Sequence, residues 1–345
     1  MVVGSSFIWN IRSGFNGGQG NIKKKLRDDK VPITVIQQDI VDRYSLLLVM
    51  KHTIVQFDKK KRKAKFFLGK YPKTETDEDR QDSDGIMDAT FSNIRGILQL
   101  SNGSIILSDA DRNCCIRKIT SRSSNRDVEP FMGKCGKCSS RPWTGNGKTF
   151  GRQIGELVPH PRRSNFFFVR SDSKVAIVNM KQRTLKSIWK NASGYLLFRQ
   201  TLDFILSGYT KIYVQCEKQT CTEVSRHSLF NASVNRGQDG PNFSQQNFNE
   251  IGFGNSQPKM LHWMSEANML AISISSDEKY PRLVDLRQNT SELMNLNKVS
   301  AHLELDAIHI DSTGYMYYAA SDPASNEDPA LYRTNLRYRG VGKNK

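Results

Sequence analysis

The residues Asp84 to Thr120 read DGIMDATFSNIRGILQLSNGSIILSDADRNCCIRKIT, and this stretch decides the expected fold. Two short β-type runs, Gly96 to Leu100 and Ile105 to Ser108, flank the turn Ser101-Asn102-Gly103-Ser104. Two such runs joined by an Asn-Gly turn are a strong local signal for a β-hairpin. A third run, Ile116 to Ile119, follows after a short loop. The stretch therefore predicts three consecutive antiparallel strands.

The order of residues in this stretch also resembles one NHL repeat, the unit that forms a blade of an NHL β-propeller. The positions that carry the resemblance are Asp84-Gly85, Phe91, Asp109, Asn113 and Ile116-Arg117-Lys118. The proline that usually follows the Phe is absent, and Asn93-Ile94-Arg95 stands in its place. The resemblance implies a propeller fold, and it implies recognition of a protein or a glycan rather than turnover of a substrate.

Units with a similar strand rhythm can be laid along most of the chain, and a repeat of about 40 to 50 residues is typical of propellers. The sequence therefore predicts an all-β protein, a six-bladed β-propeller of four-stranded antiparallel blades, as a single domain over residues 1–345. Five or seven blades stay open, because most units match only in rhythm. The expected blades cover residues 33–70, 71–136, 137–190, 191–229, 230–299 and 300–340.

The last unit lacks an outer strand, whereas the segment Ser6 to Arg12 has strand composition and no unit of its own. We expect this segment (residues 6–12) to pair with Ala330 to Asn335 and to close the last blade. Closure of a ring removes the exposed edges that make an open sheet prone to aggregation. The alternative is an N-terminal tail without a partner strand.

The composition is that of a globular protein with a strong positive charge. Charged residues make up 25% of the 345 residues and aromatic residues 9%, while the formal net charge is +17. Such a charge favours polyanionic partners, such as nucleic acid, acidic glycans, acidic proteins or an anionic membrane face. No apolar run approaches the length of about 20 residues that spans a bilayer. The N-terminus lacks the pattern of a secretory signal peptide, which taken literally favours the cytoplasm.

Cysteines and glycosylation sequons argue for an oxidising compartment instead. The vicinal cysteines begin a strand and the next pair follows the neighbouring strand, so each has a partner within reach, with the pairing undetermined. The third pair flanks a short turn. An even set of this kind predicts disulfides, and a structural zinc site is the alternative for the first four. The disulfide candidates are Cys114, Cys115, Cys135, Cys138, Cys216 and Cys221.

Five Asn-X-Ser/Thr sequons support the same secreted or lumenal location, because we expect them in accessible turns and connections between blades. In a cytoplasmic protein the same residues would be ordinary turn formers. The glycosylation candidates are Asn102, Asn191, Asn231, Asn242 and Asn289.

Catalytic chemistry has little support in the sequence. His160 and His309 are weak metal candidates, since each stands six residues before the second strand of its unit. The corresponding position of the second unit is Gln99, so a ring of metal ligands is incomplete. No cofactor and no catalytic residue is expected, and we lean toward a protein that is not an enzyme.

The leading interpretation is an extracellular, monomeric binding scaffold for an acidic protein or glycan. The candidate contacts are Lys118, Arg162, Arg163, Arg170 and Lys211. One alternative is an intracellular NHL-type propeller that binds RNA, in keeping with the positive charge. The other is a propeller metalloenzyme, either a lyase or a lactonase-like hydrolase.

Overall fold

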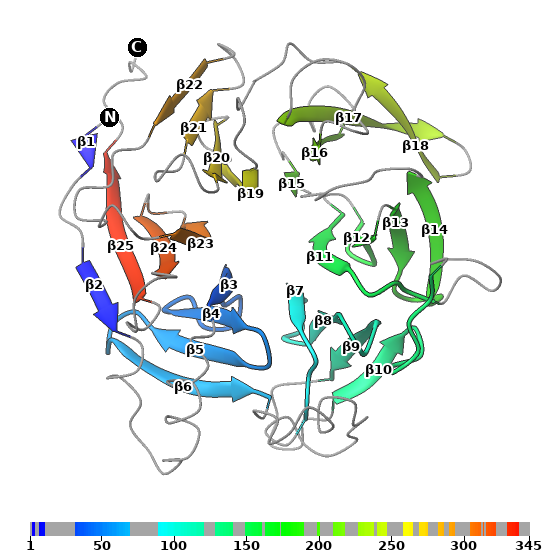
Figure 1. The fold of residues 1–345 in the computed structure, drawn as a ribbon, viewed down its shortest axis with the longest axis horizontal. Coiled ribbons are helices and arrows are strands. Elements are labelled where there is room, and N and C mark those ends of the chain that lie inside the picture. Colours follow the sequence, from blue (N-terminus) through cyan, green and yellow to red (C-terminus); the bar gives the residue numbers. More distant parts are fainter. Residues whose placement is uncertain are drawn as a thin grey trace.

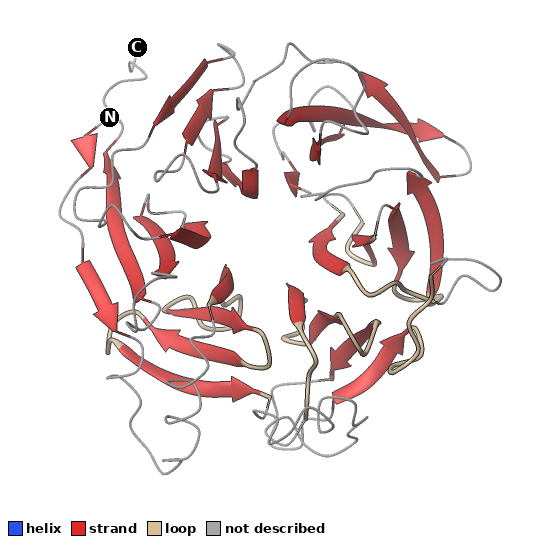
Figure 2. Cartoon of the chain, viewed as in Figure 1, coloured by secondary structure: helices blue, strands red, loops and turns tan. Residues whose placement is uncertain are grey.

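The computed structural model is a β-propeller, with sheets arranged around a central axis (Figure 1). Its described elements are strands and the loops that join them (Figure 2). None of the described residues forms a helix long and apolar enough to cross a membrane. Only the backbone is described for the strands before residue 11 and for those between residues 199 and 293. The structure describes residues 2–3, 7–10, 32–69, 89–120, 128–140, 149–160, 163–172, 174–189, 199–200, 210–217, 227–237, 240–246, 258–264, 269–274, 282–285, 290–293, 304–311, 313, 315–321 and 330–337.

The described strands pair into six antiparallel sheets, and within each sheet consecutive strands are hydrogen-bonded neighbours. The first strand of each sheet lies nearest the axis (Figure 1). The first three sheets consist of β3 (Ile33–Gln38), β4 (Ser45–Met50), β5 (Ile54–Asp58) and β6 (Lys63–Leu68); β7 (Ile94–Gln99), β8 (Ile105–Asp109), β9 (Cys115–Ile119) and β10 (Val128–Met132); and β11 (Ile154–Pro159), β12 (Phe166–Ser171), β13 (Lys174–Asn179) and β14 (Thr184–Trp189).

Two further sheets follow, and the last sheet contains β23 (Glu304–Ile310), β24 (Tyr315–Ser321) and β25 (Ala330–Arg337). The fourth and fifth sheets consist of β15 (Arg199–Gln200), β16 (Thr210–Glu217), β17 (His227–Gly237) and β18 (Gly240–Gln246), and of β19 (Pro258–Met264), β20 (Met269–Ile274), β21 (Arg282–Asp285) and β22 (Thr290–Leu293).

The N-terminal segment completes the last sheet. Strand β2 (Phe7–Asn10) pairs antiparallel with β25, in a register that runs from Phe7 opposite Arg333 to Asn10 opposite Ala330. Strand β1 (Val2–Val3) continues the same pairing farther along β25. The expected pairing of the N-terminal segment with this strand is therefore confirmed, and the two ends of the chain meet in one blade (Figure 1).

The fourth blade differs from its expected boundaries. A boundary after residue 229 would divide β17, which pairs with both β16 and β18. The sequence of β17 and β18 is rich in Asn, Ser, Gln and Gly, a composition of turns rather than strands. Pairing with neighbouring strands overrides that local preference, so the fourth blade extends to Gln246 and the strands of the fifth begin at Pro258.

Neighbouring blades pack through the inner strands, and glycine makes the closest approach possible. A Cβ atom on Gly96 in β7 would lie 2.8 Å from both the carbonyl oxygen of Gly155 and the amide nitrogen of Leu157 in β11. The Ser108 hydroxyl donates a hydrogen bond of 2.7 Å to the same carbonyl of Gly155. Apolar side chains fill the space around these contacts, and a buried cluster that includes Leu98, Phe150 and Val169 joins the second blade to the third.

Four of the residues that carry the resemblance, Phe91, Asp109, Asn113 and Arg117, form one buried network in the second blade, whereas Asp84 and Gly85 lie outside the described residues. The Asp109 carboxylate accepts hydrogen bonds from the backbone amides of Ser92 at 2.9 Å and Asn93 at 3.1 Å, and from the Asn113 side chain at 2.7 Å. The Arg117 guanidinium lies 3.3 Å from this carboxylate and also donates to the carbonyl of Thr90 at 2.6 Å. Burial raises the pKa of Asp109, and the charge of Arg117 opposes that rise.

The same guanidinium lies 4.6 Å from the centroid of the Phe91 ring, in a cation–π contact. Phe91 is fully buried and packs in a cluster with Ile94 and Leu107. The aromatic, acidic and basic residues of the motif thus hold the inner connection of the blade onto its strands. Their role in this chain is structural.

The third blade keeps only part of this network, which explains why its sequence resembles the repeat so weakly. Thr149-Phe150 repeats the Thr90-Phe91 step, and Phe150 is likewise fully buried. In the second blade, Asp109 lies opposite Ile94 on the neighbouring strand. The equivalent position in the third blade, opposite Ile154, is occupied by Ser171. The Ser171 hydroxyl accepts the amide hydrogen of Gly151 at 2.8 Å, so a neutral side chain replaces the carboxylate.

We predict that Arg117→Met destabilises the fold by about 3–5 kcal/mol, because it leaves the buried Asp109 carboxylate without its countercharge. The double variant Asp109→Asn/Arg117→Met should recover part of the loss. Urea denaturation followed by circular dichroism measures the effect. Lys118→Met is the matched control, because the Lys118–Glu129 pair is half-exposed and separated by 4.0 Å, and it should change stability by less than about 1 kcal/mol. Equal losses for both single variants would contradict the structural role of the pair.

Candidate binding face

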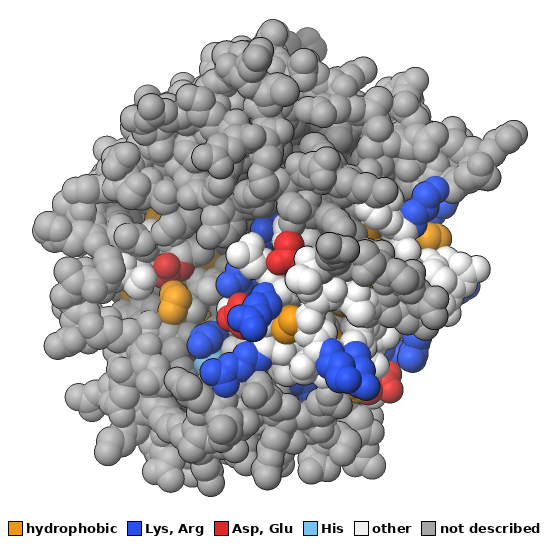
Figure 3. Space-filling view, turned by 45° about the vertical axis from the view of Figure 1, so that its right-hand side comes forward, with side chains coloured by type: hydrophobic (Ala, Val, Ile, Leu, Met, Phe, Trp, Pro, Cys, Tyr) orange, Lys and Arg blue, Asp and Glu red, His pale blue; other side chains and the backbone are white. Residues whose placement is uncertain are grey.

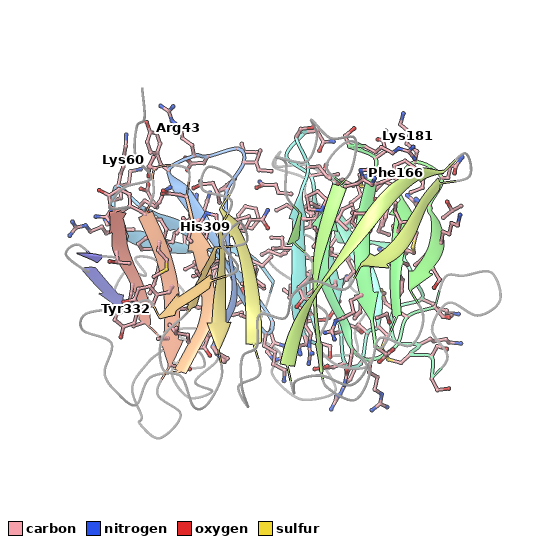
Figure 4. All side chains as sticks on the ribbon, turned by 90° about the horizontal axis from the view of Figure 1, so that it is seen from above. Arg43, Lys60, Phe166, Lys181, His309 and Tyr332 are labelled. Atoms are coloured by element: carbon pink, nitrogen blue, oxygen red, sulfur yellow. A yellow bond between two sulfur atoms is a disulfide. The ribbon has the colours of Figure 1, made fainter. Side chains whose placement is uncertain are left out.

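Two sets of turns lie on one face of the propeller, which we call the hairpin face. They join the first strand to the second and the third strand to the fourth in each blade. Figure 4 shows Arg43, Lys60, Phe166 and Lys181 toward this same side of the molecule. Among the described residues, the hairpin face comprises residues 39–44, 59–62, 100–104, 160, 163–165, 180–183, 311 and 313.

A buried carboxylate holds the first of these turns. Asp39 is 1% exposed and directly follows the inner strand β3. Its Oδ1 accepts hydrogen bonds from the backbone amide of Val41 at 3.0 Å and from the Gln99 side chain at 3.0 Å. Its Oδ2 accepts the side-chain amide of Gln56 at 2.7 Å. The Gln99 oxygen in turn accepts the backbone amide of Ile40 at 2.7 Å, so the second blade holds the turn of the first.

A second set of contacts links the first blade to the last. The Lys59 ammonium donates to the Gln38 side-chain oxygen at 2.8 Å and lies 3.7 Å from the Asp311 carboxylate. It also lies 5.6 Å from the centroid of the Tyr317 ring. Burial, followed by the charge of Asp311, raises the pKa of Tyr317 to about 12, so this phenol stays neutral at physiological pH.

The tip of the turn leaves apolar side chains in solvent. Ile40 is 54% exposed, Val41 53% and Tyr44 37%, and these are the exposed large hydrophobic residues of the described chain. Lys60 and Lys61 are exposed at the neighbouring turn. We call the group Ile40, Val41, Arg43, Tyr44, Lys60 and Lys61 the hairpin-tip patch.

Two cations hold the ring of Tyr44 within the patch. The Lys60 ammonium lies 3.6 Å from the ring centroid and the Arg43 guanidinium 4.9 Å. Arg43 also donates a hydrogen bond of 2.7 Å to the phenol oxygen. That hydrogen bond, together with Lys60, lowers the pKa of Tyr44. The patch therefore combines aliphatic, aromatic and cationic surface within one pair of turns.

The third blade adds further cations to the hairpin face. Arg163, Lys181 and Arg183 are exposed in its turns. The Arg163 guanidinium lies 5.5 Å from the centroid of the Phe166 ring, and that of Arg183 lies 5.5 Å from the Phe131 ring. The arrangement favours contact with an anionic partner. Figure 3 shows that Lys and Arg side chains also gather on the described part of the surface it displays, beside a few acidic ones.

Of the predicted cationic contacts, the three whose side chains the structure describes do not lie together on one surface. Arg163 lies on the hairpin face, as described above, whereas Lys118 lies within β9 beside Glu129. Arg170 is 3% exposed and lies 3.8 Å from Glu156, with its guanidinium against Gly155, so its proposed role as a surface contact is wrong. Lys211 belongs to β16, of which only the backbone is described, and Arg162 lies outside the described residues.

The two candidate metal ligands do not occupy equivalent positions. The amide of His160 donates to the carbonyl of Phe166, as the amide of Asp311 does to Tyr315. Asp311 is therefore the residue equivalent to His160. His309, which pairs with Tyr317, lies two positions before Asp311 in the sequence. The mismatch arises because the connection after β11 is two residues longer than the one after β23. His160 stacks on Phe168 at 5.5 Å between ring centroids, and no group of His, Cys, Asp or Glu among the described residues could hold a metal ion.

Two disulfides lie on the opposite face, where the second strand of the blade turns into the third. Cys114 pairs with Cys138, with 5.2 Å between the Cα atoms, and Cys115 pairs with Cys135, with 5.1 Å. The first four cysteines are therefore linked to one another, and the pairing left open by the sequence is resolved. Cys216 lies near the end of β16 and pairs with Ser228 of β17. Cys221 lies outside the described residues, so the predicted pairing of these two cysteines is untested.

One sequon lies in the accessible turn expected for it, and two others lie within strands instead of connections. Asn102 is exposed in the turn between β7 and β8, and its side-chain oxygen accepts the amide of Ser104 at 3.0 Å. Asn231 and Asn242 lie within strands β17 and β18 rather than in connections between blades. Asn191 and Asn289 lie outside the described residues.

Comparison with known proteins supports the fold. No family model matches the chain, and no curated protein matches it, so the NHL assignment stays a resemblance. Among solved structures, the chain is similar to an auxiliary nutrient binding protein from Bacteroides ovatus ATCC 8483, with a TM-score of 0.54 and 10% identity over 88% of this chain and 70% of that one. A similar protein from Bacteroides thetaiotaomicron VPI-5482 has a TM-score of 0.53 and 11% identity over 88% and 69%. At these identities the likeness shows the fold alone.

We predict that the pKa of Tyr44 lies below the ordinary value of 10 and rises in the Arg43→Met variant, which removes the hydrogen bond to the phenolate. A pH titration of the tyrosine Cζ resonances by NMR measures both, with Tyr44→Phe to assign the signal. Arg163→Met is the control, since Arg163 contacts Phe166 and should leave the titration of Tyr44 unchanged. An unchanged pKa in Arg43→Met would contradict the geometry of the patch.

Proposed function

We propose that the chain is a closed six-bladed propeller that works outside the cytoplasm as a non-enzymatic binding scaffold, and that its hairpin face takes an anionic partner. The observation that carries the proposal is the turn at residues 39–44. A buried Asp39 fixes its backbone, while its tip exposes Ile40, Val41 and Tyr44 beside cations. Grouped exposed apolar side chains with a polar rim are a common feature of interaction sites.

The location outside the cytoplasm is supported by the cysteines. The pairs Cys114–Cys138 and Cys115–Cys135 use all four cysteines of the second blade, and disulfides persist in oxidising compartments. Similarity of fold to nutrient-binding propellers agrees with a binding role, in which loops on a rigid ring supply the contacts. Among the described residues, Asn102 is an exposed sequon asparagine and therefore a candidate for glycosylation.

Binding to polyanions tests the proposed face. We expect the full-length protein to bind immobilised heparin and poly-glutamate, with an affinity that falls as salt rises. The variant Arg43→Ala/Lys60→Ala/Lys61→Ala should elute at lower salt from both. The control Lys134→Ala/Lys137→Ala removes exposed cations of the opposite face and should elute like the wild type. Equal shifts for both variants would remove the hairpin face as the binding site, and preference for single-stranded RNA over both probes would favour the RNA-binding alternative.

Thiol analysis tests the compartment. We predict that protein from an oxidising compartment has no free thiol at these four cysteines, and that Cys115→Ser/Cys135→Ser keeps the Cys114–Cys138 bond. The matched variant Cys115→Ser/Cys138→Ser separates two partners and should show two reactive thiols, at Cys114 and Cys135. Alkylation before and after reduction, read by mass spectrometry of the peptides, counts them. Free thiols throughout the native protein would overturn the extracytoplasmic location.

A further inference from the structure

We propose that the hairpin-tip patch binds an acidic peptide segment that inserts an apolar side chain between Ile40, Val41 and Tyr44. The inference rests on the proposed function, an anionic partner on the hairpin face, and it adds the class of partner and the place. The partner is identified by the chemistry that the patch presents, which combines aliphatic surface with cations.

The aliphatic part of the patch selects a peptide over a sulfated glycan. Ile40 and Val41 are each more than half exposed, at 54% and 53%. A Leu, Ile or Phe side chain removes such surface from water at a gain of about 25 cal/mol per Å² of apolar area. A glycan presents hydroxyl and sulfate groups, which lose hydration against these side chains without gaining a hydrogen bond.

The patch is fixed before any partner arrives. The Gln99 side-chain oxygen accepts the amide of Ile40 at 2.7 Å, and the Asp39 carboxylate accepts the amide of Val41 at 3.0 Å. Farther along the turn, Asp42 accepts the amide of Tyr44 at 3.0 Å and the hydroxyl of Ser45 at 2.6 Å. A rigid turn loses little conformational entropy on binding, so a small apolar contact contributes more to affinity.

The adjoining blade supports the apolar side of the patch. A Cβ atom on Gly103 would lie 3.3 Å from the Cγ2 atom of Val41, so the turn between β7 and β8 approaches this side chain. Gly103 has a φ of +82°, a conformation that glycine adopts readily. The exposed Asn102 precedes it, so a glycan on this sequon would stand beside the patch.

The cationic part of the patch surrounds the aromatic ring. Lys60 and Arg43 both contact Tyr44, at 3.6 Å and 4.9 Å from the ring centroid. The Lys61 side chain is 77% exposed and lies 3.8 Å from Asp58, a weak pair that a ligand carboxylate can replace. Acidic residues on either side of an apolar anchor would therefore meet cations already positioned to accept them.

The opposite face offers cations without this apolar component. Lys134 and Lys137 are exposed on the loop that the two disulfides hold. Within the described chain, none of the exposed large hydrophobic residues lies on that face. A polyanion could bind there through charge alone, whereas selection of an apolar anchor requires the hairpin-tip patch.

Selection from a random peptide library displayed on phage tests the inference on the full-length protein. We expect the selected peptides to be enriched in Asp and Glu together with Leu, Ile or Phe. Fluorescence anisotropy of the strongest peptide should give a dissociation constant about tenfold weaker for Ile40→Ser/Val41→Ser and for Arg43→Ala/Lys60→Ala. Lys134→Ala/Lys137→Ala should bind as the wild type does. Ile40 and Val41 are more than half exposed, and thermal denaturation verifies that their replacement preserves the fold.

The anchor itself is tested by exchange of the apolar residue of the peptide for Ser. This exchange should weaken binding to the wild type about tenfold and have little further effect on Ile40→Ser/Val41→Ser, because the two changes remove one contact. Unchanged affinity of Ile40→Ser/Val41→Ser, failure of the library to yield peptides of this composition, or tighter binding of heparin oligosaccharide would each overturn the inference. In the last case the proposed function stands, whereas loss of binding to every polyanion would overturn both.

Discussion

A carboxylate that is removed from water has to receive hydrogen bonds or a countercharge, and two such carboxylates organise the described blades. Asp109 receives two backbone amides, the Asn113 side chain and the Arg117 guanidinium, which fixes the inner connection of the second blade. Asp39 receives donors from its own turn and from the neighbouring Gln99, which fixes the first hairpin. One carboxylate thus determines the shape of a blade, and the other determines the shape of a candidate binding surface.

The two faces of the propeller are stabilised by different means. On the face that carries the disulfides, covalent bonds join the start of β9 to the loop after β10. The hairpin face relies on side-chain contacts between blades, namely the hydrogen bonds of Gln99 to Ile40 and Asp39 and the ion pair of Lys59 with Asp311. Because those polar groups lie beneath the turns, the exposed tips are free to carry apolar and cationic side chains. Buried polar groups thus fix the turns, and exposed side chains at the tips are available for contacts, as expected of a scaffold whose function lies in its loops.

Much of the fold could be predicted from the sequence, because Asp84 to Thr120 contains a complete set of local signals. The pairing of the N-terminal segment with β25 followed from a missing outer strand. The fourth blade was predicted poorly, since β17 and β18 have the composition of turns and form only through pairing. The candidate site was missed. Ile40 and Val41 lie between two strands where an apolar pair is unusual, but their exposure depends on Gln99, which is 59 residues away from Ile40. Arg170 was misplaced because a cation in a strand gives no local sign of burial.

The central claim is that the hairpin-tip patch is where this propeller meets an anionic partner. Hydrogen–deuterium exchange of the full-length protein, with and without saturating poly-glutamate, locates that contact without any substitution. The account predicts slower exchange at residues 39–44 and 59–62, the turns that carry Ile40, Tyr44 and Lys60, and unchanged exchange in the disulfide-linked loop at residues 133–140. Slower exchange confined to residues 133–140, with residues 39–44 unaffected, would contradict it.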